Sequence, residues 1–184
     1  MKWISCLFFY VAILINASGC RSGLESKERH SSPDNKFAII STDSKLRLVA
    51  LPSHKVLLSD FNVGNQDLSI LWSKDSSRFT CYADSGRSSE CRAFQRIGDS
   101  FSEMKLPELI LPHEAALKNK VTKWIGQRDK PLRWDDTTLT IETHGRVRVL
   151  SDTYIDYKYE FTVAFDENGQ GKVTKVEKKL FKEL

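Results

Sequence analysis

Residues 155–165 contain the clearest periodic signal in the chain. Every second residue there is aromatic or branched aliphatic, and the residues between them are polar or small. Because successive side chains of a β-strand point to opposite faces, this alternation predicts one long strand with one buried face. Tyr157, Tyr159 and Phe161 are therefore expected in the core rather than in a ligand groove. Tyr154 lies off that face and is expected to be exposed.

Short strands separated by turn residues are predicted over residues 37–106. Ser, Asp, Gly and Pro stand between the apolar runs at the spacing of an antiparallel β-meander. The expected strands cover residues 37–41, 46–51, 55–59, 68–72, 78–82, 91–96 and 101–105.

The C-terminal residues, 132–184, are expected to form β-hairpins. Strands at 138–143 and 147–150 would flank a tight turn made by His144, Gly145 and Arg146. Residues 171–176 are expected to return as the hairpin partner of the long strand. Beyond Lys179 the pattern fits either a strand or a helix, and we expect a frayed or helical end.

Residues 113–126 carry the one helical pattern. Leu117, Val121, Trp124 and Ile125 fall at i, i+4, i+7 and i+8, which places them on one face of a helix. A connector with two prolines precedes this helix and is expected to divide two structural halves.

The expected fold is mainly β (α+β). An antiparallel β-meander over residues 37–106 and one amphipathic helix would pack on a C-terminal antiparallel sheet, as a single domain over residues 37–184.

The first twenty residues have the layout of a secretory signal peptide. Lys2 supplies a positive charge, an apolar run of about 13 residues follows it, and small residues close the segment. A helix that spans a membrane needs about 20 apolar residues, so a permanent transmembrane anchor is disfavoured.

The end of this leader, Ala17-Ser18-Gly19-Cys20, resembles the lipobox of bacterial lipoproteins. The resemblance implies cleavage after residues 1–19, a diacylglycerol on the Cys20 thiol, and a further acyl chain such as palmitate on the new amino terminus. Two or three chains would anchor the protein in a membrane of the cell envelope. Arg21 rather than Asp follows the cysteine, which favours the outer membrane, facing the periplasm. The alternative is an ordinary secretion signal that ends in a chance cysteine.

Residues 20–36, the lipidated cysteine and the segment after it, are rich in Ser and charge and are expected to form a flexible tether.

Cys81 and Cys91 are expected to form a disulfide. They remain for the mature chain in an oxidising compartment, where a disulfide is the usual state. A turn centred on Gly86 would place the two cysteines directly opposite each other. Their spacing excludes a CxxC redox pair.

A weak internal repeat links Ser32-Pro33-Asp34-Asn35-Lys36-Phe37 with the segment from Ser73 to Phe79, about 41 residues later. Residues 70–76, Ile-Leu-Trp-Ser-Lys-Asp-Ser, resemble the WSPDG-type turn of TolB-like or WD40-like β-propeller repeats. The resemblance covers residues 32–106 and implies at most two four-stranded blades. Closed propellers use at least four blades, so a complete propeller is not expected.

The candidate metal ligands come close to an EF-hand calcium loop. They are Asp166, Asn168, Gln170 and Glu177. An EF-hand needs an incoming helix, whereas a strand is predicted here, so the tip of a β-hairpin explains the same letters better. No metal and no cofactor are expected.

No motif for catalysis or nucleic-acid binding stands out. Sequences of the Gly-x-Ser-x-Gly, His-Glu-x-x-His and phosphate-loop types are absent. The formal net charge of +4 is too small to indicate a nucleic-acid partner.

Two functions remain. The first is a non-catalytic, membrane-anchored interaction or structural module that binds another envelope protein. It predicts an exposed apolar patch or an open sheet edge, where a partner strand can add. The second is a lipoprotein that binds a small ligand or calcium, and it predicts a concave pocket with convergent polar groups.

Overall fold

The computed structural model describes residues 28–42, 45–62, 67–86, 89–111, 121–150 and 153–183. These residues form β-strands and no helix. The expectation of a mainly β, antiparallel fold that is not a closed propeller is therefore confirmed. The leader and Cys20 lie outside the described residues.

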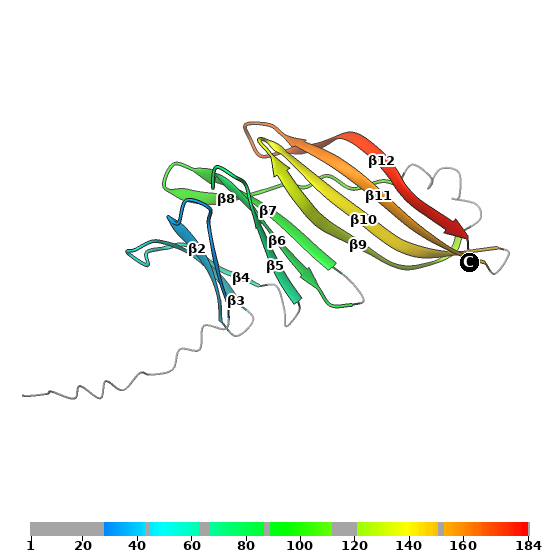
Figure 1. The fold of residues 1–184 in the computed structure, drawn as a ribbon, viewed down its shortest axis with the longest axis horizontal. Helices are drawn as coiled ribbons and strands as arrows, with labels where there is room; N and C mark the ends of the chain where they lie inside the picture. The colour runs from blue at the N-terminus through cyan, green and yellow to red at the C-terminus, as the bar shows by residue number, and fades with distance from the viewer. Residues whose placement is uncertain are drawn as a thin grey trace, which may run out of the picture.

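The strands form three four-stranded antiparallel sheets, each a meander in chain order (Figure 1). The first sheet contains β1 (Glu28–Ser31), β2 (Phe37–Thr42), β3 (Lys45–Ala50) and β4 (Val56–Asn62). The second contains β5 (Asp67–Trp72), β6 (Arg78–Asp84), β7 (Ser89–Ile97) and β8 (Ser100–Met104). The third contains β9 (Val121–Asp135), β10 (Thr138–Val149), β11 (Tyr154–Phe165) and β12 (Gly171–Glu183).

The strands predicted over residues 37–105 correspond to β2 through β8. The alternation in residues 155–165 is confirmed as β11, in which each predicted core position is buried. Tyr157, Tyr159 and Phe161 are at most 3% exposed, and Tyr154 is 38% exposed. The sequence pattern thus predicts both the strand and its buried face.

The repeated turn is the same structure in the first two sheets. Ser32 and Ser73 each donate a hydroxyl hydrogen bond of 2.7 Å to the aspartate two residues later. The backbone then turns through Asn35 (φ 57°) in the first copy and Ser76 (φ 61°) in the second. Each serine N–H closes the turn on the carbonyl five residues later, at 2.9 Å.

These hydrogen bonds set the repeat at 41 positions, so that Phe37 corresponds to Arg78 and not to Phe79. This one-residue difference matters because neighbouring strand residues face opposite ways. Phe37 faces the second sheet, whereas Phe79 faces back toward the first. The first sheet therefore faces the second sheet with the same side that the second sheet turns toward the third.

The second sheet is buried on both faces, between the first and third sheets. Phe79 and Phe94 pack with Phe37 and Leu48 in the first core. Ala93 and Met104 face the other way, into a second core with residues of the third sheet. Such two-sided burial explains the nearly continuous apolar and small residues of β6, which show no clean alternation.

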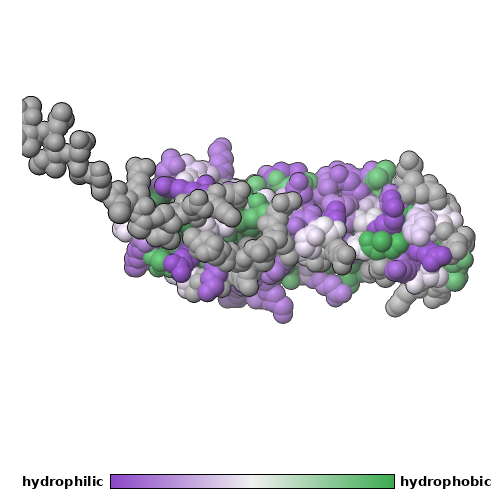
Figure 2. Space-filling view, turned by 90° about the horizontal axis from the view of Figure 1, so that it is seen from below, coloured by the Kyte–Doolittle hydropathy of each residue, from purple (hydrophilic) through white to green (hydrophobic). Residues whose placement is uncertain are grey.

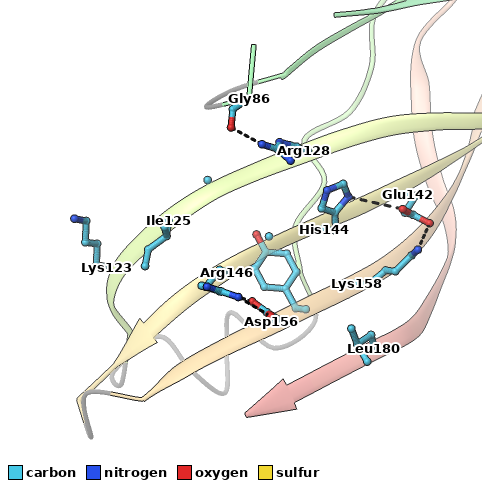
Figure 3. Close-up of a pocket in the computed structure, with 13 residues that line it drawn as sticks. Gly86, Lys123, Ile125, Arg128, Glu142, His144, Arg146, Asp156, Lys158 and Leu180 are labelled. Atoms are coloured by element: carbon cyan, nitrogen blue, oxygen red, sulfur yellow. Dashed lines mark hydrogen bonds and ion pairs between the residues drawn. The ribbon is translucent and has the colours of Figure 1, made fainter. Parts of the chain in front are cut away.

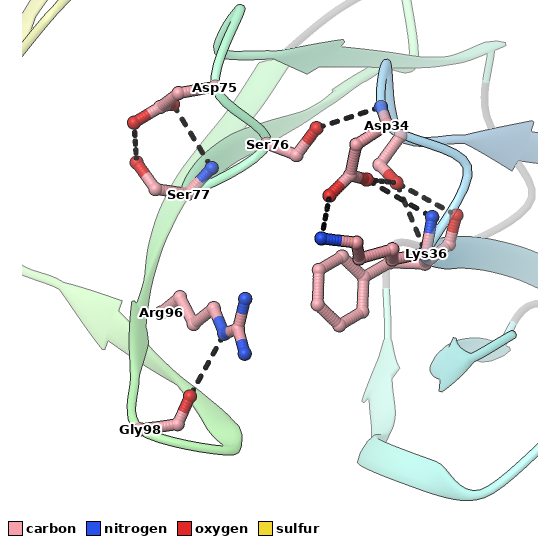
Figure 4. Close-up of polar contacts among 9 residues, drawn as sticks. Asp34, Lys36, Asp75, Ser76, Ser77, Arg96 and Gly98 are labelled. Atoms are coloured by element: carbon pink, nitrogen blue, oxygen red, sulfur yellow. Dashed lines mark hydrogen bonds and ion pairs between the residues drawn. The ribbon is translucent and has the colours of Figure 1, made fainter.

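Hydrogen bonds join the first hairpin of each sheet to that of the next. The Asp34 N–H donates to the Ser76 hydroxyl at 3.1 Å (Figure 4). Arg78 donates to the Asp136 carbonyl in the turn between β9 and β10, at 3.2 Å. The three sheets are thus held in register along one side of the stack.

The predicted helix is wrong over residues 121–126, which begin β9, while residues 112–120 lie outside the described part of the chain. Val121 pairs with Val149 and Trp124 with Val147. The long strand β10 offers this stretch backbone partners despite register irregularities at Gly145/Val147 and Arg148/Val149, and this pairing outweighs a helical spacing.

Three further expectations are corrected. The turn at residues 144–146 is instead the middle of β10, where Gly145 opposes Gln127 on one side and Tyr157 on the other. The chain beyond Lys179 is neither frayed nor helical through Glu183, because it continues to pair with β11. The flexible tether predicted over residues 20–36 is wrong over Glu28–Ser31, because these residues form β1 and pair with β2.

Candidate functional site

Cys81 and Cys91 are free thiols, which corrects the predicted disulfide. Cys81 pairs across the hairpin with Arg92, and Cys91 pairs with Tyr82. The register is shifted by one residue from a hairpin centred on Gly86, and this shift places the two cysteines on opposite faces of the sheet. Burial raises the pKa of the Cys91 thiol to about 12 and also raises the pKa of the Cys81 thiol well above its ordinary value.

The calcium-loop candidates do not converge. Asp166 closes the β11–β12 hairpin tip, where its Oδ1 accepts the N–H groups of Asn168 (2.9 Å) and Gln170 (2.8 Å). Glu177 stands on β12 opposite Glu160, on the order of 20 Å along the strand from this tip. Hydrogen bonds from Lys175 and Lys179 lower the pKa of Glu177 to about 2. The Glu177 carboxylate therefore accepts hydrogen bonds from these two lysines.

The outer groove is a concavity of about 1010 Å³ on the face of the third sheet that points away from the core (Figure 3). All four strands of this sheet contribute side chains to it, and the β6–β7 hairpin borders it at Gly86. The lining residues are Gly86, Lys123, Ile125, Gly126, Arg128, Glu142, His144, Gly145, Arg146, Asp156, Tyr157, Lys158 and Leu180.

One row of the outer groove places His144 between two cations. His144 pairs with Arg128 on β9 and with Lys158 on β11, and Lys158 pairs in turn with Leu180 on β12. Side chains at directly opposed positions of neighbouring strands lie about 5 Å apart at their Cβ atoms. The register therefore gathers basic side chains from three strands in the middle of the groove.

Acidic groups partly neutralise this row (Figure 3). Glu142 accepts Lys158 at 2.6 Å and lies 3.7 Å from the His144 Nδ1. Asp156 accepts two hydrogen bonds from Arg146, at 2.5 and 2.9 Å. Both carboxylates thus point their oxygens at cations of the protein itself.

Arg128 ties the outer groove to the second sheet. Its guanidinium donates to the Gly86 carbonyl and lies 3.5 Å from the Asp84 carboxylate. The Gly86 N–H, 2.7 Å from Asp84, and the charge of Arg128 lower the pKa of that carboxyl. The Asp129 N–H also donates to Ser89, at 3.1 Å, so the hairpin covers part of the β9 edge.

The second candidate site is the β12 edge. We use this name for the backbone of Gly171–Glu183 on the side away from β11. Only its beginning is covered within the described residues, where Lys105 accepts the Gly171 N–H at 2.9 Å and pairs with Gln170. Lys172, Lys175, Lys178 and Lys179 are exposed along it.

On the face drawn in Figure 2, the apolar residues that the structure describes are scattered and polar ones predominate among the described residues. Among the described residues, no three His, Cys, Asp or Glu side chains are grouped to hold a metal. The described part of the chain contains no helix that is long and apolar enough to cross a membrane.

The sequence pattern did not predict the outer groove. The residues that could have indicated it are the polar ones that alternate with the core residues of β11, including Asp156 and Lys158. Because Gly145 was placed in a turn, the polar positions of β10 were not aligned with those of β11.

No family model and no curated protein matches the chain. Among solved structures it is similar to one titled "The structure of putative TolB from Agrobacterium tumefaciens", with 9% identity, over 83% of this chain and 79% of that chain. The TM-score is 0.21, which is too low to carry an argument about this chain.

Proposed function

We propose that this chain is a lipid-anchored, envelope-facing module without catalytic activity that binds another envelope protein by strand addition along the β12 edge. The observation that carries the proposal is the length of that edge, 13 residues in β12. Unpaired backbone N–H and C=O groups along an edge are a template for a further strand. Lipid on Cys20 would hold the module at the membrane, in the outer membrane and facing the periplasm.

The charge of β12 selects the kind of partner. Its sequence, GKVTKVEKKLFKE, contains five lysines against two glutamates. Lysine on an edge strand opposes pairing with neutral or basic strands, which include a second copy of β12. An extended segment rich in Asp and Glu would instead gain from the same lysines. We therefore assign the β12 edge to an acidic strand of a different protein.

The test is crosslinking and mass spectrometry of the tagged full chain in its native envelope. The variant Lys172→Glu/Lys175→Glu reverses two exposed charges on β12. It is expected to reduce the crosslinked partner about tenfold or more, because attraction becomes repulsion. The matched control, Lys45→Glu/Lys55→Glu, changes the net charge equally at exposed positions on β3 and just before β4. It is expected to retain the partner.

The anchor is tested in the same experiment by Cys20→Ala, which is expected to release the protein from the membrane and to lose the partner. Equal loss of the partner in the β12 variant and its control would refute recognition through this edge. Retention of the partner in both would refute it as well.

A further inference from the structure

We infer that the outer groove binds a small organic anion, namely a carboxylate or phosphate group attached to a short apolar body. This site is separate from the β12 edge and needs no partner protein. Its size of about 1010 Å³ suits a small molecule.

The first argument is a surplus of hydrogen-bond donors. Lys123, Arg128, Arg146 and Lys158 line the outer groove, against the two lining carboxylates of Glu142 and Asp156. Arg128 also reaches the Gly86 carbonyl and, at 3.5 Å, the Asp84 carboxylate. The four cations carry about sixteen N–H donors, whereas the three carboxylates offer about twelve acceptor positions. The acceptors are already directed at the groove's own cations. A ligand that offers only acceptors, such as a carboxylate or phosphate, complements this lining.

The second argument is the row of basic side chains in the middle of the outer groove. Arg128 and Lys158 flank His144 there from the two neighbouring strands, so basic side chains of three adjacent strands stand in one row. A single carboxylate, that of Glu142, lies 2.6 Å from the Lys158 ammonium and 3.7 Å from the His144 Nδ1. Arg128 has the Asp84 carboxylate at 3.5 Å on its other side. An anion bound between Arg128 and Lys158 would give both cations a further acceptor, on the side of the row where His144 offers no negative charge.

The third argument identifies the rest of the ligand. Ile125 on β9 and Leu180 on β12 lie on opposite sides of the outer groove (Figure 3). They are 41% and 46% exposed, which is high for large aliphatic side chains in a folded domain. An apolar body of a few carbon atoms, held by its anionic end at the basic row, reaches one of these side chains. The site therefore favours an alkyl carboxylate over a bare inorganic anion.

The experiment is an amide chemical-shift titration of the full chain carrying Cys20→Ala, at low salt. Hexanoate is the probe, hexanol is its neutral match, and inorganic phosphate is the anion without an apolar body. Hexanoate is expected to give saturable shifts at residues 123–128, 142–146 and 156–158. Hexanol is expected to give none, and phosphate is expected to bind more weakly than hexanoate. Added salt should weaken hexanoate binding, because the ion pairing is screened.

Two variants give effects of opposite sign. Lys123 makes no ion pair within the described residues, so Lys123→Gln removes a cation without orphaning a partner. Lys123 lies five residues before Arg128 along β9, on the order of 15 Å from the basic row, so it acts on the bound anion only through its charge. Its removal is expected to weaken hexanoate binding about 1.5-fold at low salt. Glu142→Gln removes a competing carboxylate beside Lys158, and it is expected to tighten binding about threefold. Lys55→Gln, at an exposed lysine just before β4, is expected to leave hexanoate binding unchanged.

The inference is overturned if hexanol shifts the same amides as hexanoate, if Lys123→Gln matches Lys55→Gln, or if Glu142→Gln weakens binding. It is also overturned if hexanoate gives no shifts while vesicles of phosphatidylglycerol shift these amides. In that case the occupant is a lipid surface. None of these outcomes depends on the β12 edge, so they do not decide the proposed function.

Discussion

Gly145→Ala tests directly whether Gly145 is in the middle of a strand or in a turn. A Cβ built on Gly145 would lie 2.3 Å from the Gly126 carbonyl oxygen and 2.5 Å from the Tyr157 hydroxyl. The nearer atom belongs to the backbone of β9 and cannot rotate away, so the strands must separate. Forced overpacking of this kind costs about 1–3 kcal/mol.

The sign of the change in the free energy of unfolding distinguishes a clash at Gly145 from a simple gain in strand propensity. By propensity alone, replacing a glycine within a strand by alanine stabilises by about 0.5–1 kcal/mol. An approach of 2.3 Å to a backbone oxygen puts the cost in the upper part of that range, at about 2–3 kcal/mol. With a gain of about 1 kcal/mol subtracted, we expect a net destabilisation of about 1–2 kcal/mol. For a domain of this size that corresponds to a fall in Tm of about 2–8 °C.

Thermal unfolding followed by circular dichroism is the assay, with Gly98→Asn as the control. Gly98 has a φ of 59°, which Asn tolerates, and a Cβ there meets nothing within 4 Å. The control is expected to change Tm by less than Gly145→Ala does. A Tm for Gly145→Ala equal to or above that of the unchanged protein would refute the position of Gly145 between β9 and β11.

Three further predictions follow from the second sheet. Burial raises the pKa of Asp75, but hydrogen bonds from Ser77 and Ser73 outweigh it and lower the pKa to about 2 from an ordinary value of 3.8. The stability that Asp75 contributes is therefore complete above pH 3.8 and lost toward pH 2, so in acid titrations the deficit of Asp75→Asn should vanish over that range. Cys81 and Cys91 should resist alkylation in the folded protein and react in denaturant without reductant; a requirement for reductant would show a disulfide. Phe79→Ala, at a fully buried position, should cost about 3–5 kcal/mol in urea unfolding, and a loss below 1 kcal/mol would contradict the burial of β6.

The sequence was most informative where a strand has one buried face. Residues 155–165 alternate because β11 packs its odd-numbered residues on the core, and that pattern depends only on the strand itself. The second sheet has no such pattern, since both of its faces are covered. Its strands were nevertheless predicted, because turn residues separate them.

The errors share one cause: each concerns a position set by a partner strand. Val121 and Ile125 fit a helical spacing, and only the presence of β10 makes them part of a strand. Gly145 reads as a turn residue until β9 and β11 are both aligned with it. The register between Cys81 and Arg92 depends on hairpin geometry, which composition does not determine. The outer groove follows from the same registers and could not be predicted without them.

The most direct test of the central claim is site-specific photocrosslinking from the β12 edge. A photoreactive residue at Thr174, which is exposed on β12, is compared with one at Lys45 in the first sheet, in the full chain within its native envelope. The account predicts that Thr174 captures one partner through an acidic, extended segment, that Lys45 does not, and that Lys172→Glu/Lys175→Glu abolishes the capture. Equal capture from both positions, or a captured segment without excess Asp and Glu, would contradict recognition through the β12 edge.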